Sequence, residues 1–170
     1  MSNWDRQAHY DWFAMKGEDF VPPDFVVPLY RETQQFRLEP LGPEHNERDY
    51  AAWTSSKEHI HSTPGWQGSS WPREMTLEDN LCDLERHADD FRRRVGFTYT
   101  VRERPSGEVV GCVYIYPVPG GESDARVLSW VRASRAELDV PLWRTVSEWI
   151  ASDWPFEEIE YAARVSESQA

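Results

Sequence analysis

Hydrophobic positions recur at helical spacing between residues 76 and 95. Six of them follow one another at intervals of three or four: Leu77, Leu81, Leu84, Ala88, Phe91 and Val95. This spacing places them on one face and predicts an amphipathic helix. Thr76 and Asp79 match a capping box at its start, and Gly96 can adopt the left-handed conformation that ends a helix.

The apolar pattern changes to alternation after Gly96. Phe97, Tyr99 and Val101 alternate with polar residues, and residues 104–108 carry the Pro and Gly that favour a turn. Residues 109–116 return as a second strand that is apolar on both faces. Such a strand is typical of the buried centre of a sheet.

The remaining pattern predicts further strands and helices around this hairpin. Strands are expected at residues 35–41, 125–132 and 159–165, helices at 44–56 and 139–153, and a long loop at 57–75. Asp139 is expected to cap the last helix. In chain order the elements are strand, helix, helix, three strands, helix and strand, which indicates a mixed α/β domain.

The first 34 residues differ in composition from the rest of the chain. They form an extension rich in aromatic and acidic side chains, and residues 35–170 are expected to form the folded domain. Prolines at positions 22, 23 and 28 exclude the extension from the interior of a sheet. It is expected to lie over the domain as an arm, to pair at a sheet edge, or to pair with a second subunit in a homodimer.

Charge limits the partners that the chain can have. Its 170 residues include 18 Lys and Arg against 30 Asp and Glu, which gives a formal net charge of −12. This charge disfavours nucleic acid and anionic membranes as partners. It would attract a cationic partner, such as an amine-bearing small molecule or a basic protein, and the alternative is that it only keeps the protein soluble. No apolar run is long enough to span a bilayer, and no secretory signal is visible. Two cysteines are too few for a disulfide framework, so a cytoplasmic protein with reduced thiols is expected.

The element order and two segments resemble the GNAT family of acyl-coenzyme A-dependent N-acyltransferases over about residues 35–165. The segments are GEVVGCVYI at 107–115 and LSWVR at 128–132, the second leading into a helix. The resemblance implies a central, mostly antiparallel sheet flanked by helices. It also implies that two strands part near Val131 and that the cofactor enters the gap, with its pyrophosphate on main-chain N–H groups at the next helix start.

The resemblance further implies transfer of an acyl group, most simply acetyl, from acetyl-coenzyme A to a primary amine by direct attack. It places cofactor binding at Trp130, Val131, Arg132, Ala133 and Arg135. The chain departs from the family because no glycine follows position 121 and because it ends near the fifth strand of the pattern. Arg132 and Arg135 would supply side-chain donors to the phosphates instead. A catalytically silent GNAT-like binding or interaction module is therefore the alternative.

The resemblance places the loop at 57–75 beside the acceptor pocket. His59 and His61 in this loop are candidate proton acceptors, because histidine titrates near neutral pH. The resemblance assigns the acceptor pocket to three aromatic residues: Trp66, Trp71 and Tyr116. Tyr114 is the third catalytic candidate. The competing interpretation is that the histidines are solvated and the aromatic rings pack in the core.

Other chemistries lack their motifs. The histidines do not have a recognised metal-ligand spacing and no paired-cysteine motif occurs, so no metal is expected. Cys112 lies in a predicted buried strand and is expected to be an inert thiol. The sequence leaves the acceptor and the acyl length open.

Overall fold

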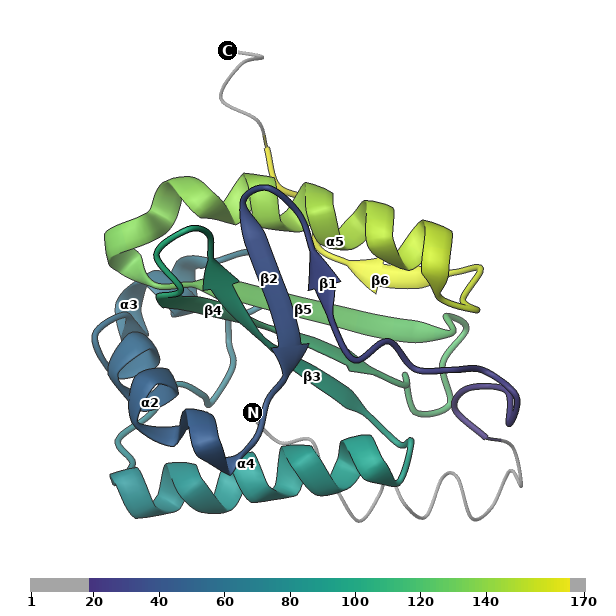
Figure 1. The fold of residues 1–170 in the computed structure, drawn as a ribbon, viewed down its shortest axis with the longest axis horizontal. Helices are drawn as coiled ribbons and strands as arrows, with labels where there is room; N and C mark the ends of the chain where they lie inside the picture. The colour runs from purple at the N-terminus through teal and green to yellow at the C-terminus, as the bar shows by residue number, and fades with distance from the viewer. Residues whose placement is uncertain (1–18, 166–170) are drawn as a thin grey trace.

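A six-stranded sheet runs through the centre of the molecule, in the part of the chain that the computed structural model describes, residues 19–165 (Figure 1). The strands lie in the order β1-β2-β3-β4-β5-β6. Their bounds are β1 (Arg31–Glu32), β2 (Phe36–Pro40), β3 (Phe97–Glu103), β4 (Val109–Tyr116), β5 (Ala125–Val131) and β6 (Ile159–Tyr161). All neighbours are antiparallel except β5 and β6, which are parallel. The prediction of a mixed α/β fold with a mostly antiparallel sheet is confirmed.

Helices cover both faces of this sheet. They are η1 (Pro43–His45), α2 (Asn46–Thr54), α3 (Lys57–Ser62), α4 (Leu77–Arg92), η2 (Ala133–Leu138) and α5 (Asp139–Asp153), where η marks a 3-10 helix. Trp53 of α2 and Ile60 of α3 join one core cluster, and Leu142 and Trp149 of α5 join the other. Figure 1 shows α4 and α5 on opposite sides of the strands. None of the helices in the described part of the chain is long and apolar enough to cross a membrane.

Strand β4 separates these two cores. All eight of its residues are buried. Val113 and Ile115 contribute to the core beneath α5, whereas Cys112 and Tyr114 contribute to the core beneath α2 and α3. The alternation of side chains along a strand therefore supplies both faces, and the prediction of a central strand buried on both sides is confirmed.

Helix α4 and its capping box are confirmed. Thr76 Oγ1 accepts a hydrogen bond from the N–H of Asp79 (3.0 Å), and Asp79 Oδ2 accepts one from the N–H of Thr76 (2.9 Å). The predicted stop is wrong in detail, because Arg94 takes the left-handed conformation (φ 61°). Gly96 is required for a different reason, since a Cβ there would collide with the ring of Tyr116.

The buried face of α4 is more polar than the apolar spacing predicts. Its buried residues are Asn80, Leu84, His87 and Asp90, whereas Leu77 is 40% exposed. Hydrogen bonds make this burial possible: Trp53 Nε1 donates to Asn80 Oδ1 (3.0 Å), and His87 Nδ1 lies 2.9 Å from Thr98 Oγ1. Partners from other elements thus decide which side of the helix faces inward.

Three other predictions are corrected. The loop expected at 57–75 contains α3, whose one buried residue, Ile60, is too little to produce a helical pattern. The strand expected at 159–165 ends at Tyr161. Asp139 is the first residue of α5 and makes no capping hydrogen bond, because its carboxylate accepts from Arg164 instead.

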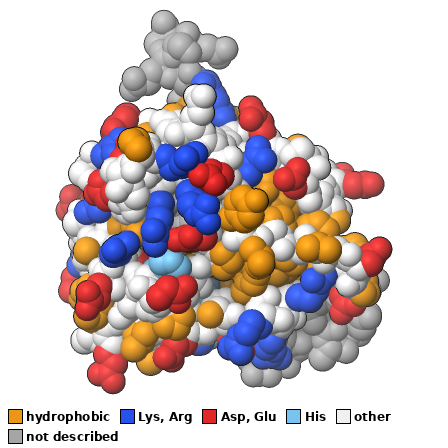
Figure 2. All heavy atoms as spheres, viewed as in Figure 1, with side chains coloured by type: hydrophobic (Ala, Val, Ile, Leu, Met, Phe, Trp, Pro, Cys, Tyr) orange, Lys and Arg blue, Asp and Glu red, His pale blue; other side chains and the backbone are white. Residues whose placement is uncertain are grey.

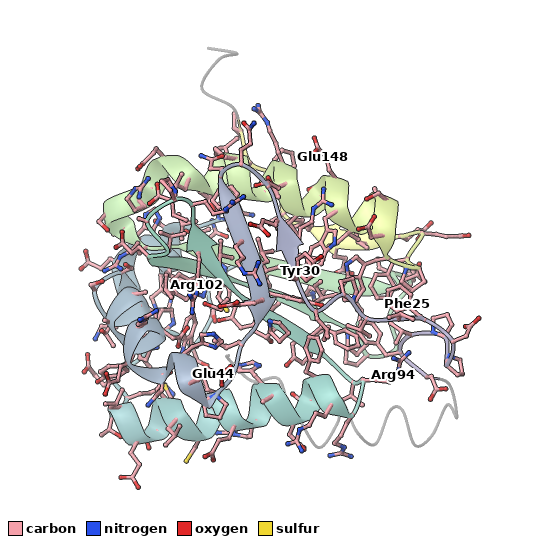
Figure 3. The ribbon with its side chains drawn as sticks, viewed as in Figure 1. Phe25, Tyr30, Glu44, Arg94, Arg102 and Glu148 are labelled. Atoms are coloured by element: carbon pink, nitrogen blue, oxygen red, sulfur yellow. The ribbon has the colours of Figure 1, made fainter. Side chains whose placement is uncertain are left out.

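The arm reaches the sheet edge. Its first 18 residues lie outside the described residues. In the described part, β1 pairs with β2 as the edge strand, which is one of the alternatives expected. Side chains of the domain bind the residues that precede β1. The Arg94 guanidinium donates to the carbonyls of Pro22 (2.8 Å) and Phe25 (2.9 Å), and Tyr99 OH donates to the carbonyl of Pro28 (2.7 Å). Figure 3 shows Arg94 beside Phe25.

Candidate functional site where two parallel strands diverge

Strands β5 and β6 pair over three positions and then separate. The partners are Ala125 with Ile159, Arg126 with Glu160, and Val127 with Tyr161. On its other edge β5 remains paired with β4 as far as Val131. The strands therefore part after Val127, four residues before the position expected from the sequence.

Beyond Val127, no strand in residues 19–165 pairs with this edge of β5. The N–H of Arg132 donates to Val110 O (2.8 Å), which establishes which residues along β5 direct their main-chain groups toward β4. Alternate residues of an antiparallel strand direct their main-chain groups to opposite edges. Trp130 therefore faces β4 with its N–H and C=O, and Ser129 and Val131 face the gap.

The side chain of Arg164 occupies this gap. Its guanidinium donates to Ser129 O (Nη2, 3.0 Å), Asp139 Oδ2 (Nε, 2.9 Å) and Ala162 O (Nη1, 2.7 Å), and it is 2% exposed. Tyr161 lies against it, with its OH 2.6 Å from Ser129 Oγ. Burial raises the pKa of Tyr161 to about 12, so this hydroxyl stays protonated at neutral pH.

A second side chain reaches the same carbonyl. Trp66 Nε1 donates to Ser129 O (2.9 Å) from the loop that follows α3. Gly65 of this loop has φ +95° and lies beside Leu128 and Ala162, so the loop crosses from β5 to the residues after β6. Trp66 and Arg164 together saturate the acceptor capacity of Ser129 O.

The N–H and guanidinium groups of the loop after β5 also bind other protein groups. The N–H of Ala133 donates to Ser56 Oγ (2.8 Å), and that of Arg135 donates to Arg132 O (2.9 Å). The Arg135 guanidinium pairs with Glu103 and Glu137 and lowers the pKa of both carboxyl groups. Arg132 Nη1 pairs with Glu108 Oε1 (2.9 Å). The groups expected to hold a pyrophosphate thus already bind other residues.

The predicted acceptor aromatics are buried and pack in the core cluster beneath α2 and α3. The ring centroids of Trp66 and Trp71 lie 5.3 Å apart, those of Trp71 and Trp130 lie 6.1 Å apart, and those of Trp66 and Tyr114 lie 5.5 Å apart. Trp130 Nε1 donates to Tyr114 OH (3.0 Å). Burial raises the pKa of Tyr114 well above its usual value. Tyr116 belongs to another network, in which its OH donates to Asp90 (3.1 Å) and lies 3.0 Å from His87.

The two candidate histidines lie on α3. His61 Nε2 is 2.7 Å from Pro72 O, and His59 Nε2 is buried with no hydrogen-bond partner within residues 19–165. Hydrogen bonds in that range join neither of them to the β5 edge. Over the same residues, no group of three His, Cys, Asp or Glu is placed to hold a metal ion.

The residues that occupy the gap were not recognisable in the sequence. Arg164, Asp139, Ser129 and Ser56 carry no motif, and a buried arginine runs against the usual preference for exposed charge. Because a strand is expected at 159–165, the sequence predicts Arg164 only as one of its alternating residues.

Comparison with known proteins identifies the fold. No protein-family model and no curated protein sequence matches the chain. Solved structures do match. The ribosomal-protein-S5-alanine acetyltransferase of Vibrio fischeri is 11% identical, with 72% of this chain and 67% of that chain covered and a TM-score of 0.55.

Two further solved structures agree. An acetyltransferase of Salmonella typhimurium that modifies the N-terminal serine of ribosomal protein L7/L12 is 12% identical (TM-score 0.55; 75% of this chain and 69% of that chain covered). The microcin C7 self-immunity acetyltransferase MccE, solved with acetyl-CoA and AMP, is 13% identical (TM-score 0.53; 78% and 69% covered). The chain therefore has the fold of the GNAT acetyltransferases.

Proposed function

We propose that this protein transfers an acetyl group from acetyl-coenzyme A to a primary amine. The observation that carries the proposal is the divergence of β5 and β6, after which the edge of β5 at Ser129 and Val131 has no strand partner in the described part of the chain. An exposed strand edge binds amide-bearing chains through main-chain hydrogen bonds. The fold is shared with acetyltransferases, of which MccE was solved with acetyl-CoA.

The fit of the cofactor differs between its two ends. Ser129 and Val131 suit the amide-bearing arm once the Arg164 guanidinium moves away. The loop after β5 does not suit the pyrophosphate through its N–H groups, because Ser56 Oγ occupies that of Ala133. When bound, the cofactor supplies an activated thioester carbonyl.

A histidine of α3 is proposed to accept the proton that the amine loses. We propose His59 for this role because its buried Nε2 has no hydrogen-bond partner among the described residues. His61 is the second candidate. The net charge of −12 would attract a cationic acceptor, either a small molecule or a protein amine.

A second candidate function is a catalytically silent module that keeps the fold without the reaction. The observation that favours it is the occupied gap, where Trp66 and Arg164 both bind Ser129 O. A ligand would have to break the buried ion pair between Arg164 and Asp139 to enter.

Calorimetry with acetyl-coenzyme A distinguishes the two candidates. The wild type, Arg164→Ala and the control Arg126→Ala, which lies on the same strand pair but at the surface, would be compared. Binding by the wild type supports the enzyme, whereas binding that appears only when Arg164 is removed supports the silent module. If neither protein binds while both remain folded, the acetyl-transfer proposal is wrong.

The arm is proposed to join two copies of the chain. Val26 (84% exposed), Leu29 (68%) and Tyr30 (60%) precede β1, which is the edge strand of the sheet in the described part of the chain. Figure 2 shows an apolar patch on this face, beside a group of arginines. Light scattering on the wild type and on Leu29→Asp tests this: a monomeric wild type contradicts it.

A cytoplasmic location is likewise a proposal, consistent with two cysteines that are free in the structure.

A further inference from the structure

A hollow of about 610 Å³ lies where η1 and the start of α2 meet the first turns of α4. Its volume falls in the range of small-molecule sites, about 300–1,000 Å³. Arg102 of β3 completes its border. Strand β4 separates β3 from β5, so this hollow and the gap between β5 and β6 are different sites.

One border of the hollow is apolar. Leu77 and Leu81 of α4 line it together with Pro43 of η1. Leu77 is 40% exposed, and Leu81 is half-buried. Residues four apart lie on the same side of a helix, so the two leucines form one continuous apolar surface. An apolar group of a ligand would gain free energy by covering this surface.

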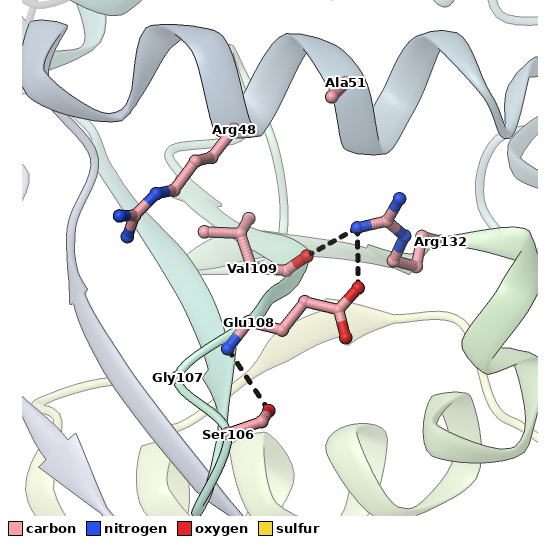
Figure 4. Close-up of a pocket in the computed structure, with 7 residues that line it drawn as sticks. All are labelled: Arg48, Ala51, Ser106, Gly107, Glu108, Val109 and Arg132. Atoms are coloured by element: carbon pink, nitrogen blue, oxygen red, sulfur yellow. Dashed lines mark hydrogen bonds and ion pairs between the residues drawn. The ribbon is translucent and has the colours of Figure 1, made fainter.

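Two guanidinium groups also border the hollow, and both have donors left. Arg48 is exposed and has no hydrogen bond or ion pair with any residue in the range 19–165. Figure 4 shows its guanidinium directed away from Arg132 and Glu108, which pair with each other (2.9 Å). Arg102 Nε lies 2.8 Å from Glu39 Oε1, and neither Nη group of Arg102 makes a hydrogen bond within the described residues. The hollow can therefore bind a carboxylate through charge-assisted hydrogen bonds.

Two carboxylates border the same hollow. Glu47 is exposed, and its carboxylate has no partner within residues 19–165. Glu44 Oε1 lies 3.6 Å from His45 Nδ1, but this nitrogen accepts the N–H of Gly42 (3.0 Å) and so has no proton to donate. In Figure 3, Glu44 lies nearer to α4 than Arg102 does. Both signs of charge are thus present in one hollow, at different places along its border.

We propose that this hollow binds a free α-amino acid with an apolar side chain. The two arginines bind its carboxylate, the two glutamates bind its ammonium group, and the leucines of α4 contact its side chain. A simple anion or cation would meet as many like charges as opposite ones here, whereas a zwitterion can place each charge beside its opposite. Exposed ion pairs are weak by themselves, so the apolar contact is needed for affinity. The proposal does not depend on acetyl transfer.

Amide chemical shifts of the full chain, titrated with L-leucine near about pH 6.5, test the proposal, because an α-amino group is charged at this pH. We expect saturable shifts at the N–H groups of Glu47 and Leu77. Three analogues each lack one of the recognised groups: N-acetylleucine the ammonium, leucinamide the carboxylate and glycine the side chain. Each should bind about tenfold more weakly than leucine, or weaker still.

Two variants assign the charged contacts. Arg48→Ala should weaken leucine binding about tenfold and leave leucinamide binding unchanged, because leucinamide has no carboxylate to lose a partner. Glu47→Gln should weaken leucine binding and leave N-acetylleucine binding unchanged. Arg144→Ala and Glu148→Gln, at exposed positions of α5, are the matched controls and should bind leucine as the wild type does.

Three outcomes would overturn the proposal. In the first, leucine leaves the N–H signals of Glu47 and Leu77 unmoved. In the second, leucinamide or N-acetylleucine binds as tightly as leucine, which would mean that the hollow recognises one charge only. In the third, the α5 controls lose as much affinity as the variants of the hollow, which would indicate screening of surface charge. All four substituted side chains are exposed, and circular dichroism verifies that the variants fold.

Discussion

The guanidinium of Arg164 and the carboxylate of Asp139, the first residue of α5, form an ion pair at the gap between β5 and β6. Nε lies 2.9 Å from Oδ2, and the side chains are 2% and 16% exposed. A buried charge that loses its partner is poorly solvated, which makes such a pair costly to break. This pair therefore both closes the gap and contributes to the stability of the fold.

Arg164→Ala is expected to lower the free energy of unfolding by about 3 kcal/mol, because Asp139 is left as an unpaired buried charge. The matched control is Arg126→Ala. Its pair with Glu160 joins the same strands but is 39% and 44% exposed, so the loss should stay below about 1 kcal/mol. Denaturant unfolding measures both. Equal losses for the two variants would mean that Arg164 is not held as described.

Asp49 is expected to make stability depend on pH. Burial raises its pKa from 3.8 to about 7; the hydrogen bond from Asn80 opposes the rise and the charge of Asp83 adds to it. Between these two values the folded state binds a proton that the unfolded state has released, so this group makes stability fall as pH rises. Above neutral pH, the raised pKa of Asp49 lowers the free energy of unfolding by up to about 4 kcal/mol.

Asp49→Asn isolates this contribution, because its amide oxygen can still accept from Asn80 and its charge does not change with pH. The variant should match the wild type near about pH 4 and exceed it in stability near about pH 8. Thermal unfolding across this range measures the difference between the two proteins. A constant difference at all pH values would show that Asp49 titrates normally.

The two thiols are expected to differ in reactivity. Cys82 is exposed, whereas Cys112 is buried and burial raises its pKa well above the usual value. Since the thiolate is the reactive form, iodoacetamide should alkylate one cysteine of the folded protein and both in denaturant, as counted by mass spectrometry. Cys82→Ser should then be unreactive until it unfolds. Rapid labelling of this variant in the folded state would contradict the burial of Cys112.

Thr76→Ala should destabilise the protein by about 1 kcal/mol, because the N–H of Asp79 loses its acceptor at the start of α4. Thr76→Ser keeps the hydroxyl and serves as the control. The main-chain N–H of Thr76, which the alanine variant keeps, lowers the pKa of Asp79 most, and the Thr76 side chain lowers it further. Denaturant unfolding compares the three proteins, and equal stability of Thr76→Ala and Thr76→Ser would show that the hydroxyl does not stabilise the start of α4.

Local patterns predicted the elements that depend on neighbouring residues. Residues 109–116 are apolar on both faces and became the fully buried β4, and Thr76 and Asp79 placed the start of α4. Helix α3 escaped prediction because it buries Ile60 alone. The inward face of α4 was assigned wrongly because Asn80 and His87 are buried by partners on other elements.

The site depended on contacts between distant parts of the chain. Arg164 meets Asp139 at a separation of 25 residues and Ser129 at a separation of 35. The expected opening near Val131 exists, but it begins after Val127 and contains the side chains of Arg164 and Trp66.

By itself, the order of apolar and polar residues determined the kind of fold, because secondary structure and burial follow from periodicity along a short segment. Only the tertiary structure decided what fills the space between β5 and β6, because the burial of a charged side chain depends on partners far away in the chain. Arg164 is the clearest case: its sequence neighbours predict an alternating strand, and its spatial neighbours make it an occupant of the gap.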